Sequence, residues 1–367
     1  MSLPLIVTGM HRSGTSLTAS LIQAIGVDFG ENLLPGDCFN AKGYFEDVDF
    51  LEFQRSRLQE SCPPGDPGWP DWGWTESETL DRDRFNSHIH TAKAIVSQRD
   101  RASIWGWKDP RTSLMLDFWH HLLPEARYVF VYRLPWDVVD SIIRLNSTIF
   151  SQRPDYAIRS WAYYNRQILA FYRQYPERCL LLNVNSVLQQ PNRLVELLKT
   201  KLGLPLSENV NPAHLQEIYD PHLFKQLEDN HPLVQFLQNP AFPYLSLLQQ
   251  LDSIADIPSQ FSASPQPNSA PPLELFPLML HHRALQAHSQ LESLSQLQQD
   301  KRALQAQNQQ LTAEINNIKS SKLGKVQQTW VKIKGWLIRQ GLSRLLGKTT
   351  DARSQFVPPT GDRVNLR

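Results

Sequence analysis

A short run of glycine and hydroxyl residues near the N-terminus has the spacing of a phosphate-binding loop. It reads Gly9-Met-His-Arg-Ser-Gly14-Thr15-Ser16, follows an apolar stretch and opens a helical pattern. Two glycines five positions apart let the backbone curl so that N–H groups point inward, and the positive end of the following helix also attracts anions. We expect Ser13, Gly14, Thr15 and Ser16 to bind phosphate. The alternative is a glycine turn that binds no ligand.

The loop departs at one position from the pattern of nucleoside triphosphatases, G-x-x-x-x-G-K-[ST], because Thr15 stands in place of lysine. The charge of a bound phosphate must then be neutralised by another residue, and Arg12 inside the loop is the candidate. No predicted strand ends in a clear Mg²⁺-binding aspartate, although Asp109 is a weak candidate for that role. The sequence therefore predicts an anion with less charge than a triphosphate, and no metal.

An arginine and a serine eight residues apart form a second candidate anion site. Arg133 follows the apolar stretch Tyr128–Tyr132, and Ser141 lies one or two turns into the next helical pattern. A guanidinium group offers a planar fork of donors, and a hydroxyl group adds another. Both groups would lie at the carboxyl end of a strand, where open α/β sheets bind ligands. The alternative is a local ion pair between Arg133 and Asp137.

These two motifs resemble those of the sulfotransferase family, whose donor is 3′-phosphoadenosine 5′-phosphosulfate. The Arg-Ser-Gly-Thr form of the loop is similar to the tyrosylprotein and bacterial branches, and Arg133 with Ser141 resembles the family's 3′-phosphate site. The resemblance covers residues 3–204 and implies transfer of a sulfuryl group to a hydroxyl or amine of a small molecule, sugar or peptide. Asn183-Val-Asn185 stands where the family often has Tyr-Glu, so this segment receives no predicted role.

The resemblance also implies which basic residues take part in the reaction. Lys108 lies in Trp-Lys-Asp-Pro-Arg, and tyrosylprotein enzymes have a similar Lys-Asp-Pro whose lysine contacts the bridging oxygen of the donor. Lys108 and Arg12 are therefore the expected catalytic cations. Asp109 would orient the lysine, and Arg111 would supply a further donor. The alternative for these charged residues is a cluster of ion pairs on the surface.

The expected general base is Glu46, in Gly-Tyr-Phe-Glu-Asp. An acidic residue after the first helix resembles the base position of the tyrosylprotein branch, and aromatic neighbours would exclude water and raise the pKa of the carboxyl group. Asp47 is the second candidate and His11 the third. The alternative for an acidic residue in a loop is a solvated side chain without a catalytic role.

Two other classes of protein stay open at this point. A P-loop kinase or nucleotide hydrolase is disfavoured by Thr15 at the lysine position and by the pair Arg133 and Ser141. A non-catalytic scaffold, in which a degenerate nucleotide fold presents a coiled coil, is disfavoured because Gly9 and Arg12 are intact. Stabilisation by adenosine 3′,5′-bisphosphate, by ATP with Mg²⁺ or by neither would separate the three classes.

These residues must be positioned by an alternation of strands and helices that continues to about residue 257. The predicted strands are Leu3–Thr8, Ile104–Trp107, Tyr128–Tyr132 and Cys179–Val184. The helical patterns between them are Thr15–Ile25, Leu114–Leu123, Asp137–Leu145, Ala157–Tyr175 and Pro191–Leu202. Such an alternation predicts an α/β, P-loop-like fold of three layers around a central parallel sheet, with a C-terminal helical and coiled-coil extension.

A Pro- and Gly-rich stretch, Cys62–Trp74, is expected to be a loop. It contains Trp69, Trp72 and Trp74. Flat aromatic rings in a loop could stack on a sugar or an aromatic acceptor, or they could anchor the loop to the core.

The remaining part of the chain, residues 258–367, has a different composition. Residues 258–277 contain six prolines and four serines, which indicates an extended linker. Residues 278–321 are predicted to form a short coiled coil, with Asn308 setting the register and with homo-oligomers as the consequence. Its two core positions hold Leu297, Leu304, Leu311 and Ile318, and Leu294, Lys301, Asn308 and Ile315. A lone amphipathic helix is the alternative.

Residues 322–348 carry seven Lys or Arg and no acidic residue. Val326, Trp330, Ile333 and Leu337 fall on one face of a helix, so we expect a basic amphipathic helix that contacts a membrane or an acidic partner. Helix–helix packing within an assembly and disorder are the alternatives. Residues 349–367 are expected to be a disordered tail.

The overall charge balance hides this division. The chain has 367 residues, of which 37 are Lys or Arg and 36 are Asp or Glu, but residues 1–257 hold 23 basic and 30 acidic residues and residues 258–367 hold 14 and 6. This distribution excludes a general nucleic-acid coat, and no nucleic-acid partner is expected. Three scattered cysteines, the lack of a signal-peptide pattern and the lack of a long apolar run favour the cytoplasm, with peripheral membrane contact through residues 322–348.

Overall fold

The computed structural model describes residues 2–36, 43–64, 68–69, 73–145, 147–153, 155–206, 225–239, 242–262, 275–320 and 322–339. The chain divides into two compact units, Met1–Leu291 and Glu292–Arg367. Within the described residues, no helix is long and apolar enough to cross a lipid bilayer.

Four parallel strands form the sheet in the order β2-β1-β3-β4. The central strand β1 (Leu3–Thr8) pairs with β2 (Ile104–Lys108) on one side and with β3 (Arg127–Tyr132) on the other, and β4 (Cys179–Asn183) pairs with β3. The strands are almost wholly buried, as parallel strands covered on both faces must be. The strands that follow β1 in sequence lie on both sides of it, β2 on one side and β3 and β4 on the other. The loop after β1 therefore occupies the position where such sheets bind ligands.

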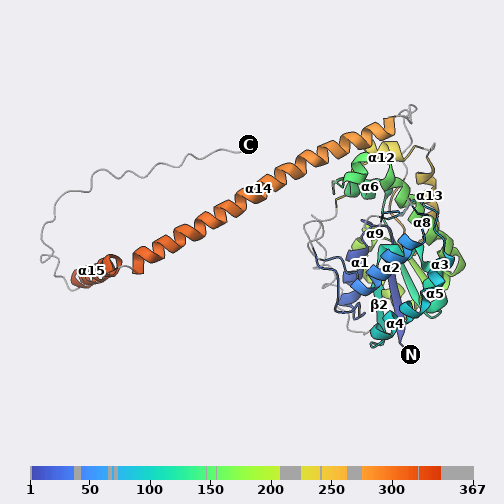
Figure 1. Cartoon of the computed structure of the whole chain (residues 1–367), viewed down its shortest axis with the longest axis horizontal. Coiled ribbons are helices and arrows are strands. Elements are labelled where there is room, and N and C mark those ends of the chain that lie inside the picture. The colour runs from blue at the N-terminus through green and yellow to red at the C-terminus, as the bar shows by residue number, and fades with distance from the viewer. Residues whose placement is uncertain are drawn as a thin grey trace. The chain divides into compact units, whose positions relative to one another are not determined.

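Helices surround the sheet (Figure 1). In the first unit they are α1 (Thr15–Ala24), α2 (Val48–Glu60), α3 (Asp83–Asn86), α4 (Ile89–Arg99), α5 (Leu116–Leu122), α6 (Pro135–Ile143), α7 (Thr148–Gln152), α8 (Tyr156–Gln174), α9 (Val184–Gln189), α10 (Pro191–Thr200), α12 (Pro232–Leu237) and α13 (Pro243–Ile254). Short 3₁₀ turns cover Pro110–Leu114 and Pro176–Arg178.

Alternate side chains of each strand enter two separate cores, because successive residues of a strand point to opposite faces. Ile6 and Phe130 join the larger core, which α2, α5, α6, α8, α12 and α13 complete. Leu5 and Val129 join the smaller core, which α1, α9 and α10 complete. The molecule therefore has the predicted three layers around a parallel sheet, and the prediction of an α/β fold is confirmed.

The sequence prediction located all four strands, with ends that differ by at most one residue. Strand β2 extends to Lys108, β3 begins at Arg127, and β4 ends at Asn183 because that side chain caps α9. The helical patterns do not include α2, α3, α4, α7, α9, α12 and α13. In α4 only Ala92 is buried, so its sequence lacks the regular apolar stripe by which helices are recognised.

Contacts of the first unit extend past residue 257, where the sequence predicts the end of the catalytic domain. Ile257 forms an isolated parallel bridge with β4. The Ser259 amide donates to Asp252 Oδ1 at 2.8 Å, and the Phe261 ring packs edge-on against Trp136, with centroids 4.9 Å apart. The first residues of the predicted linker therefore pack against α13 and α6 of this unit.

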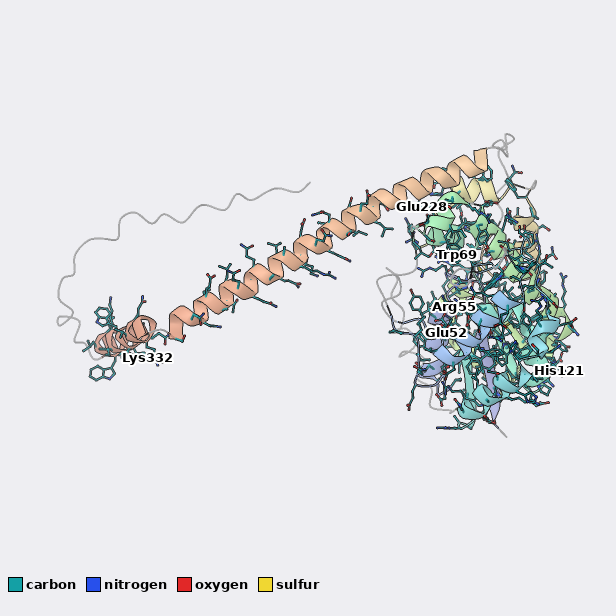
Figure 2. All side chains as sticks on the ribbon, viewed as in Figure 1. Glu52, Arg55, Trp69, His121, Glu228 and Lys332 are labelled. Carbon is teal, nitrogen blue, oxygen red and sulfur yellow. The ribbon has the colours of Figure 1, made fainter. Side chains whose placement is uncertain are left out.

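Two helices occupy the C-terminal part of the chain. Helix α14 (Leu275–Ser320) begins three residues before the predicted coiled coil, inside the predicted linker, and α15 (Lys322–Arg339) covers part of the predicted basic helix. Leu297 and Leu304 of α14 are 63% and 66% exposed, and side chains stand out along the helix (Figure 2). The coiled coil and the homo-oligomer stay predictions. Residues 340–367 lie outside the described residues.

Candidate active site

The loop after β1 has the backbone of an anion cradle. A Cβ atom on Gly9 would lie 2.1 Å from the Val131 carbonyl oxygen, so only glycine fits where the loop passes β3. Arg12 and Gly14 have φ values of 65° and 89°, and such left-handed residues turn successive N–H groups to one side. Helix α1 then begins at Thr15, and the first N–H groups of a helix have no acceptor within it.

One side chain of the loop supports the same interpretation. Ser13 is fully buried, and its Oγ has no hydrogen-bond partner among the described residues. An unsatisfied buried hydroxyl costs about 1–3 kcal/mol, so it is expected where a ligand completes the hydrogen bond. The residues present therefore fit a bound phosphate or sulfate group. The alternative of a glycine turn without a ligand does not account for this hydroxyl.

The second anion motif lies against the loop. Arg12 Nε donates to Ser141 Oγ at 3.0 Å, and Arg133 Nη1 reaches the Arg12 carbonyl oxygen at 3.5 Å. Burial lowers the pKa of the Arg133 guanidinium to about 10, against the opposing effect of Asp137, so the group stays charged at neutral pH. Tertiary structure thus brings together two cations and a hydroxyl from positions more than 120 residues apart.

The alternative for Arg133, an ion pair with Asp137, is also present. The Arg133 Nε to Asp137 Oδ2 distance is 3.6 Å, and Asp137 accepts a hydrogen bond from the Leu227 amide at 2.9 Å. Arg133 also donates to the Lys225 carbonyl oxygen. Asp137 therefore holds the guanidinium in place while Arg133 still contacts the loop, and the two interpretations are compatible.

The segment Asn183-Val-Asn185, which received no predicted role from the sequence, has a structural role. Asn183 Oδ1 accepts hydrogen bonds from the amides of Asn185 and Ser186, at 3.1 Å and 3.4 Å, and so caps α9. Asparagine is among the residues that suit this position best.

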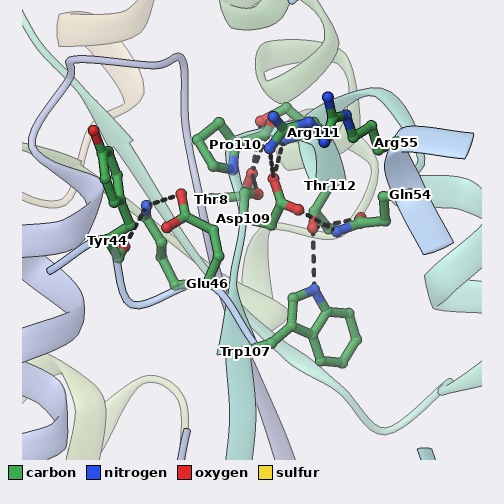
Figure 3. A network of polar contacts seen from close by, with 12 residues as sticks. Thr8, Tyr44, Glu46, Gln54, Arg55, Trp107, Asp109, Pro110, Arg111 and Thr112 are labelled. Carbon is green, nitrogen blue, oxygen red and sulfur yellow. Dashed lines mark hydrogen bonds and ion pairs between the residues drawn. The ribbon is translucent and has the colours of Figure 1, made fainter. Parts of the chain in front are cut away.

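A buried ion pair forms the centre of the site. Lys108 Nζ lies 2.5 Å from Glu46 Oε1 and 2.8 Å from the Tyr44 carbonyl oxygen (Figure 3). Lys108 is 2% exposed and Glu46 4%. The Tyr44 carbonyl also accepts a hydrogen bond from Ser16 Oγ at 3.0 Å. One carbonyl oxygen therefore connects the first turn of α1 with the lysine at the end of β2, an arrangement that the sequence does not reveal.

Glu46 has the properties of a general base. Burial raises the pKa of its carboxyl group, and the nearby Lys108 ammonium partly offsets this effect. Its second oxygen, Oε2, is buried and has no hydrogen-bond partner among the described residues. The carboxylate is thus held by one oxygen while the other can accept a proton from a substrate.

The other two candidate bases have different surroundings. Asp47 Oδ1 accepts from the Asp49 and Phe50 amides at 3.0 Å and 3.4 Å, and its Oδ2 lies 2.6 Å from Arg99 Nε. One oxygen therefore caps α2, and the other pairs with Arg99 at the end of α4. Burial and three neighbouring cations lower the pKa of His11 well below its ordinary value, so its imidazole is neutral near pH 7.

Substitution of Asp47 by Asn is expected to leave turnover within about threefold of the wild-type value. Asparagine keeps the N-cap hydrogen bonds of α2 but loses the ion pair with Arg99. We expect the free energy of unfolding to fall by about 1–2 kcal/mol. Initial rates at saturating substrates and thermal melts measure the two effects. A loss of turnover above 100-fold in a folded variant would make Asp47 the base.

Asp109 does not contact the lysine beside it, contrary to the expectation that it orients Lys108. Its Oδ1 accepts from the Arg111 amide and from Arg111 Nη1, at 2.8 Å and 3.1 Å, and its Oδ2 accepts from Gln54 Nε2 at 2.9 Å (Figure 3). Glu46 and the Tyr44 carbonyl orient the lysine instead.

These charged residues are buried, which rules out the alternative of an ion-pair cluster on the surface. Arg111 is 5% exposed and Asp109 1%. Gln54, which the sequence did not single out, also accepts from Thr112 Oγ1 at 2.7 Å and from Trp119 Nε1 at 3.0 Å. It therefore fixes Asp109 from α2, and no local pattern marks a glutamine for this role.

The tryptophan-rich loop is anchored to the core at both of its described tryptophans, Trp69 and Trp74. Trp74 is fully buried and its Nε1 donates to Cys62 Sγ at 3.3 Å. Trp69 is partly buried and packs against the larger core. Trp72 lies outside the described residues. The structure therefore gives Trp74, and to a lesser extent Trp69, the anchoring role.

The described part of the chain contains no group of three or more His, Cys, Asp or Glu side chains that could hold a metal ion. Cys62 and Cys179 are free thiols, both buried. Cys38 lies outside the described residues.

Comparison with known proteins places this site in a family. The sequence profile of the sulfotransferase family matches residues 4–208, which is more than half of the chain. No curated protein matches. Similar solved structures include the sulfotransferase domain of the olefin synthase from Synechococcus PCC 7002, which is 18% identical, covers 69% of this chain and 94% of that chain, and has a TM-score of 0.38.

Two further solved structures are similarly distant. The sulfotransferase domain from the curacin biosynthetic pathway is 17% identical, with 70% of this chain and 99% of that chain covered and a TM-score of 0.37. Sulfotransferase STF9 from Mycobacterium avium is 17% identical, with 59% of this chain and 67% of that chain covered and a TM-score of 0.37. Because the family profile matches more than half of the sequence, including the cradle and the residues around Lys108 and Arg133, the chain belongs to the sulfotransferase family and is a sulfotransferase.

Proposed function

We propose that the enzyme uses 3′-phosphoadenosine 5′-phosphosulfate as its donor and sulfates a hydroxyl or amine of an acceptor. The observation that carries the proposal is the Tyr44 carbonyl, which accepts from both Ser16 and Lys108. This contact puts the anion cradle, the lysine and Glu46 in one hydrogen-bonded chain. A donor phosphate in the cradle would therefore lie beside both a cation and a base.

Each end of the donor has its own group of residues in this proposal. Ser13, Gly14, Thr15 and Ser16 would hold the 5′-phosphosulfate, with Arg12 neutralising its charge. Arg133 and Ser141 would hold the 3′-phosphate. Arg12 contacts Ser141 directly and Arg133 through its carbonyl oxygen, so the two groups form one continuous surface.

When bound, the donor supplies an SO₃ group on a phosphate leaving group. Lys108 would stabilise the negative charge that develops on the bridging oxygen as its bond to sulfur breaks. Glu46 would accept the proton of the acceptor hydroxyl as the new sulfur–oxygen bond forms. Since Lys108 and Glu46 are in contact, the proton acceptor and the charge-stabilising cation would both lie beside the SO₃ group that is transferred.

Local charges must achieve this binding, because the domain as a whole repels anions. Residues 1–257 have 23 basic and 30 acidic residues, a net charge of −7. Arg12, Lys108 and Arg133 therefore have to act at short range together with the N–H groups of the cradle.

A ligand titration tests the donor. Adenosine 3′,5′-bisphosphate, which carries both phosphate positions, is expected to stabilise the full chain against heat, by about 2.7 kcal/mol at 100 times its dissociation constant. ATP with Mg²⁺ serves as the comparison. Preference for ATP with Mg²⁺ would overturn the proposal in favour of a kinase or hydrolase, and no stabilisation by either ligand would favour a scaffold. Labelled donor and a panel of sugars, tyrosine peptides and alcohols would then identify the acceptor.

A further inference from the structure

Helix α15 has a surface that the transfer reaction does not use. Its 18 residues, Lys322–Arg339, include five Lys or Arg and no acidic residue. Large apolar side chains on the same helix are exposed, among them Trp330 at 55% and Ile333 at 50%. We propose that α15 lies on the surface of an anionic lipid bilayer and holds the enzyme there.

The distribution of side chains around the helix fits a bilayer surface. At 100° per residue, Val326, Trp330, Ile333 and Leu337 fall within about 60° of one another. Three of the five cations, Lys325, Lys332 and Arg339, fall within about 40° of one another on the other side of the helix, and Lys322 and Lys334 flank the apolar arc. Such a separation lets the apolar side enter the boundary between headgroups and acyl chains while the cations stay among the headgroups.

The apolar surface is wider than one stripe. Val331 and Ile338, exposed by 62% and 55%, lie about 80–100° beyond Trp330, and Trp336, exposed by 55%, lies within about 20° of Lys325. A helix that binds in the groove of a protein presents one stripe of positions i, i+3, i+4 and i+7. Apolar side chains beyond one stripe, with a second tryptophan beside the cations, suit the interface of a bilayer better, because indole rings are favoured at headgroup depth, where the cations would also lie.

The positive charge also argues against a second copy of α15 as the partner. Two such helices would bring ten cations together without an acidic residue to offset them. An anionic lipid surface instead attracts each cation. Lys334 Nζ lies 5.6 Å from the centre of the Trp330 ring, so this lysine lies beside the apolar arc and can extend its ammonium group towards lipid phosphates.

Sedimentation of the full chain with lipid vesicles tests the proposal. We expect at least tenfold stronger binding to phosphatidylcholine vesicles containing 30% phosphatidylserine than to phosphatidylcholine alone, and weaker binding in 0.5 M salt. The triple variant Lys325→Gln, Lys332→Gln, Arg339→Gln should lose at least tenfold of this affinity. The matched variant Lys301→Gln, Arg302→Gln removes two cations from α14 and should bind like the wild type.

Other results would overturn the proposal that α15 binds an anionic bilayer. Equal binding to both vesicles, no binding, or unchanged binding of the triple variant would each remove the lipid role. A fall in molar mass of the triple variant by light scattering, without a change in vesicle binding, would assign α15 to self-assembly. Stabilisation by adenosine 3′,5′-bisphosphate should be the same in all variants, so failure of the lipid proposal and failure of the proposed donor are separate results.

Discussion

Substitution of Glu46 by Gln is expected to lower turnover by about 10²–10⁴-fold, the usual contribution of a general base. Glutamine keeps the size of the side chain but cannot accept the proton of an attacking hydroxyl. Stabilisation by adenosine 3′,5′-bisphosphate should persist, because the residues proposed to bind the nucleotide are unchanged. Initial rates with saturating donor and acceptor measure the loss.

The pH dependence of the wild type should reveal the same group. Burial raises the pKa of the Glu46 carboxyl, and only the deprotonated form is a base. Activity should therefore be lost as the pH falls through this raised pKa, at a higher pH than an ordinary glutamate would give. The Glu46→Gln variant should lack this step in its profile.

Asp47→Asn is the matched control for this experiment, because it removes a neighbouring buried carboxylate whose oxygens contact α2 and Arg99. If Glu46→Gln turns over at a rate close to that of the wild type while folded, Glu46 is not the base. If Asp47→Asn also keeps its turnover, His11, with its buried Nε2, would be the next candidate.

Lys108→Met is expected to lower turnover at least 100-fold while sparing nucleotide binding. Methionine fills similar space without the charge that would stabilise the leaving phosphate. The substitution also removes the cation that lowers the pKa of Glu46, so that pKa should rise further. The acid limb of the residual activity should move to higher pH, a shift that a purely structural defect would not produce.

Lys201→Met is the control for the loss of a paired lysine. Lys201 Nζ lies 2.5 Å from Asp256 Oδ1, the same separation as in the Lys108–Glu46 pair, but it joins α10 to the segment after α13. This variant should lose stability and keep its turnover per folded molecule. Turnover near the wild-type value in Lys108→Met would exclude the lysine from the reaction.

The double variant of Glu46 and Lys108 measures how far the two residues act together. Because their side chains are in contact, its loss of turnover should be smaller than the product of the two single losses. Independent, multiplying losses would show that the contact has no part in the reaction.

Local sequence determined the strands of this protein and its anion-binding loop. The apolar stretches of the strands, the glycines at positions 9 and 14, and Arg133 after a buried strand depend on neighbours within a few residues, and their order along the chain implies a parallel sheet. Position after a strand was enough to predict that the cradle and Arg133 lie at the same edge, because parallel strands end on one side of a sheet.

Tertiary structure alone decided how the reacting groups are paired. Lys108 meets Glu46 across 62 positions, and Gln54 meets Asp109 across 55. Adjacency in sequence suggested that Asp109 orients Lys108, but alternate residues at the end of a strand point to opposite faces, and Asp109 turns towards Arg111 instead. Burial, which raises the pKa of Glu46 and leaves one of its oxygens without a partner, depends on elements that only the folded chain brings together.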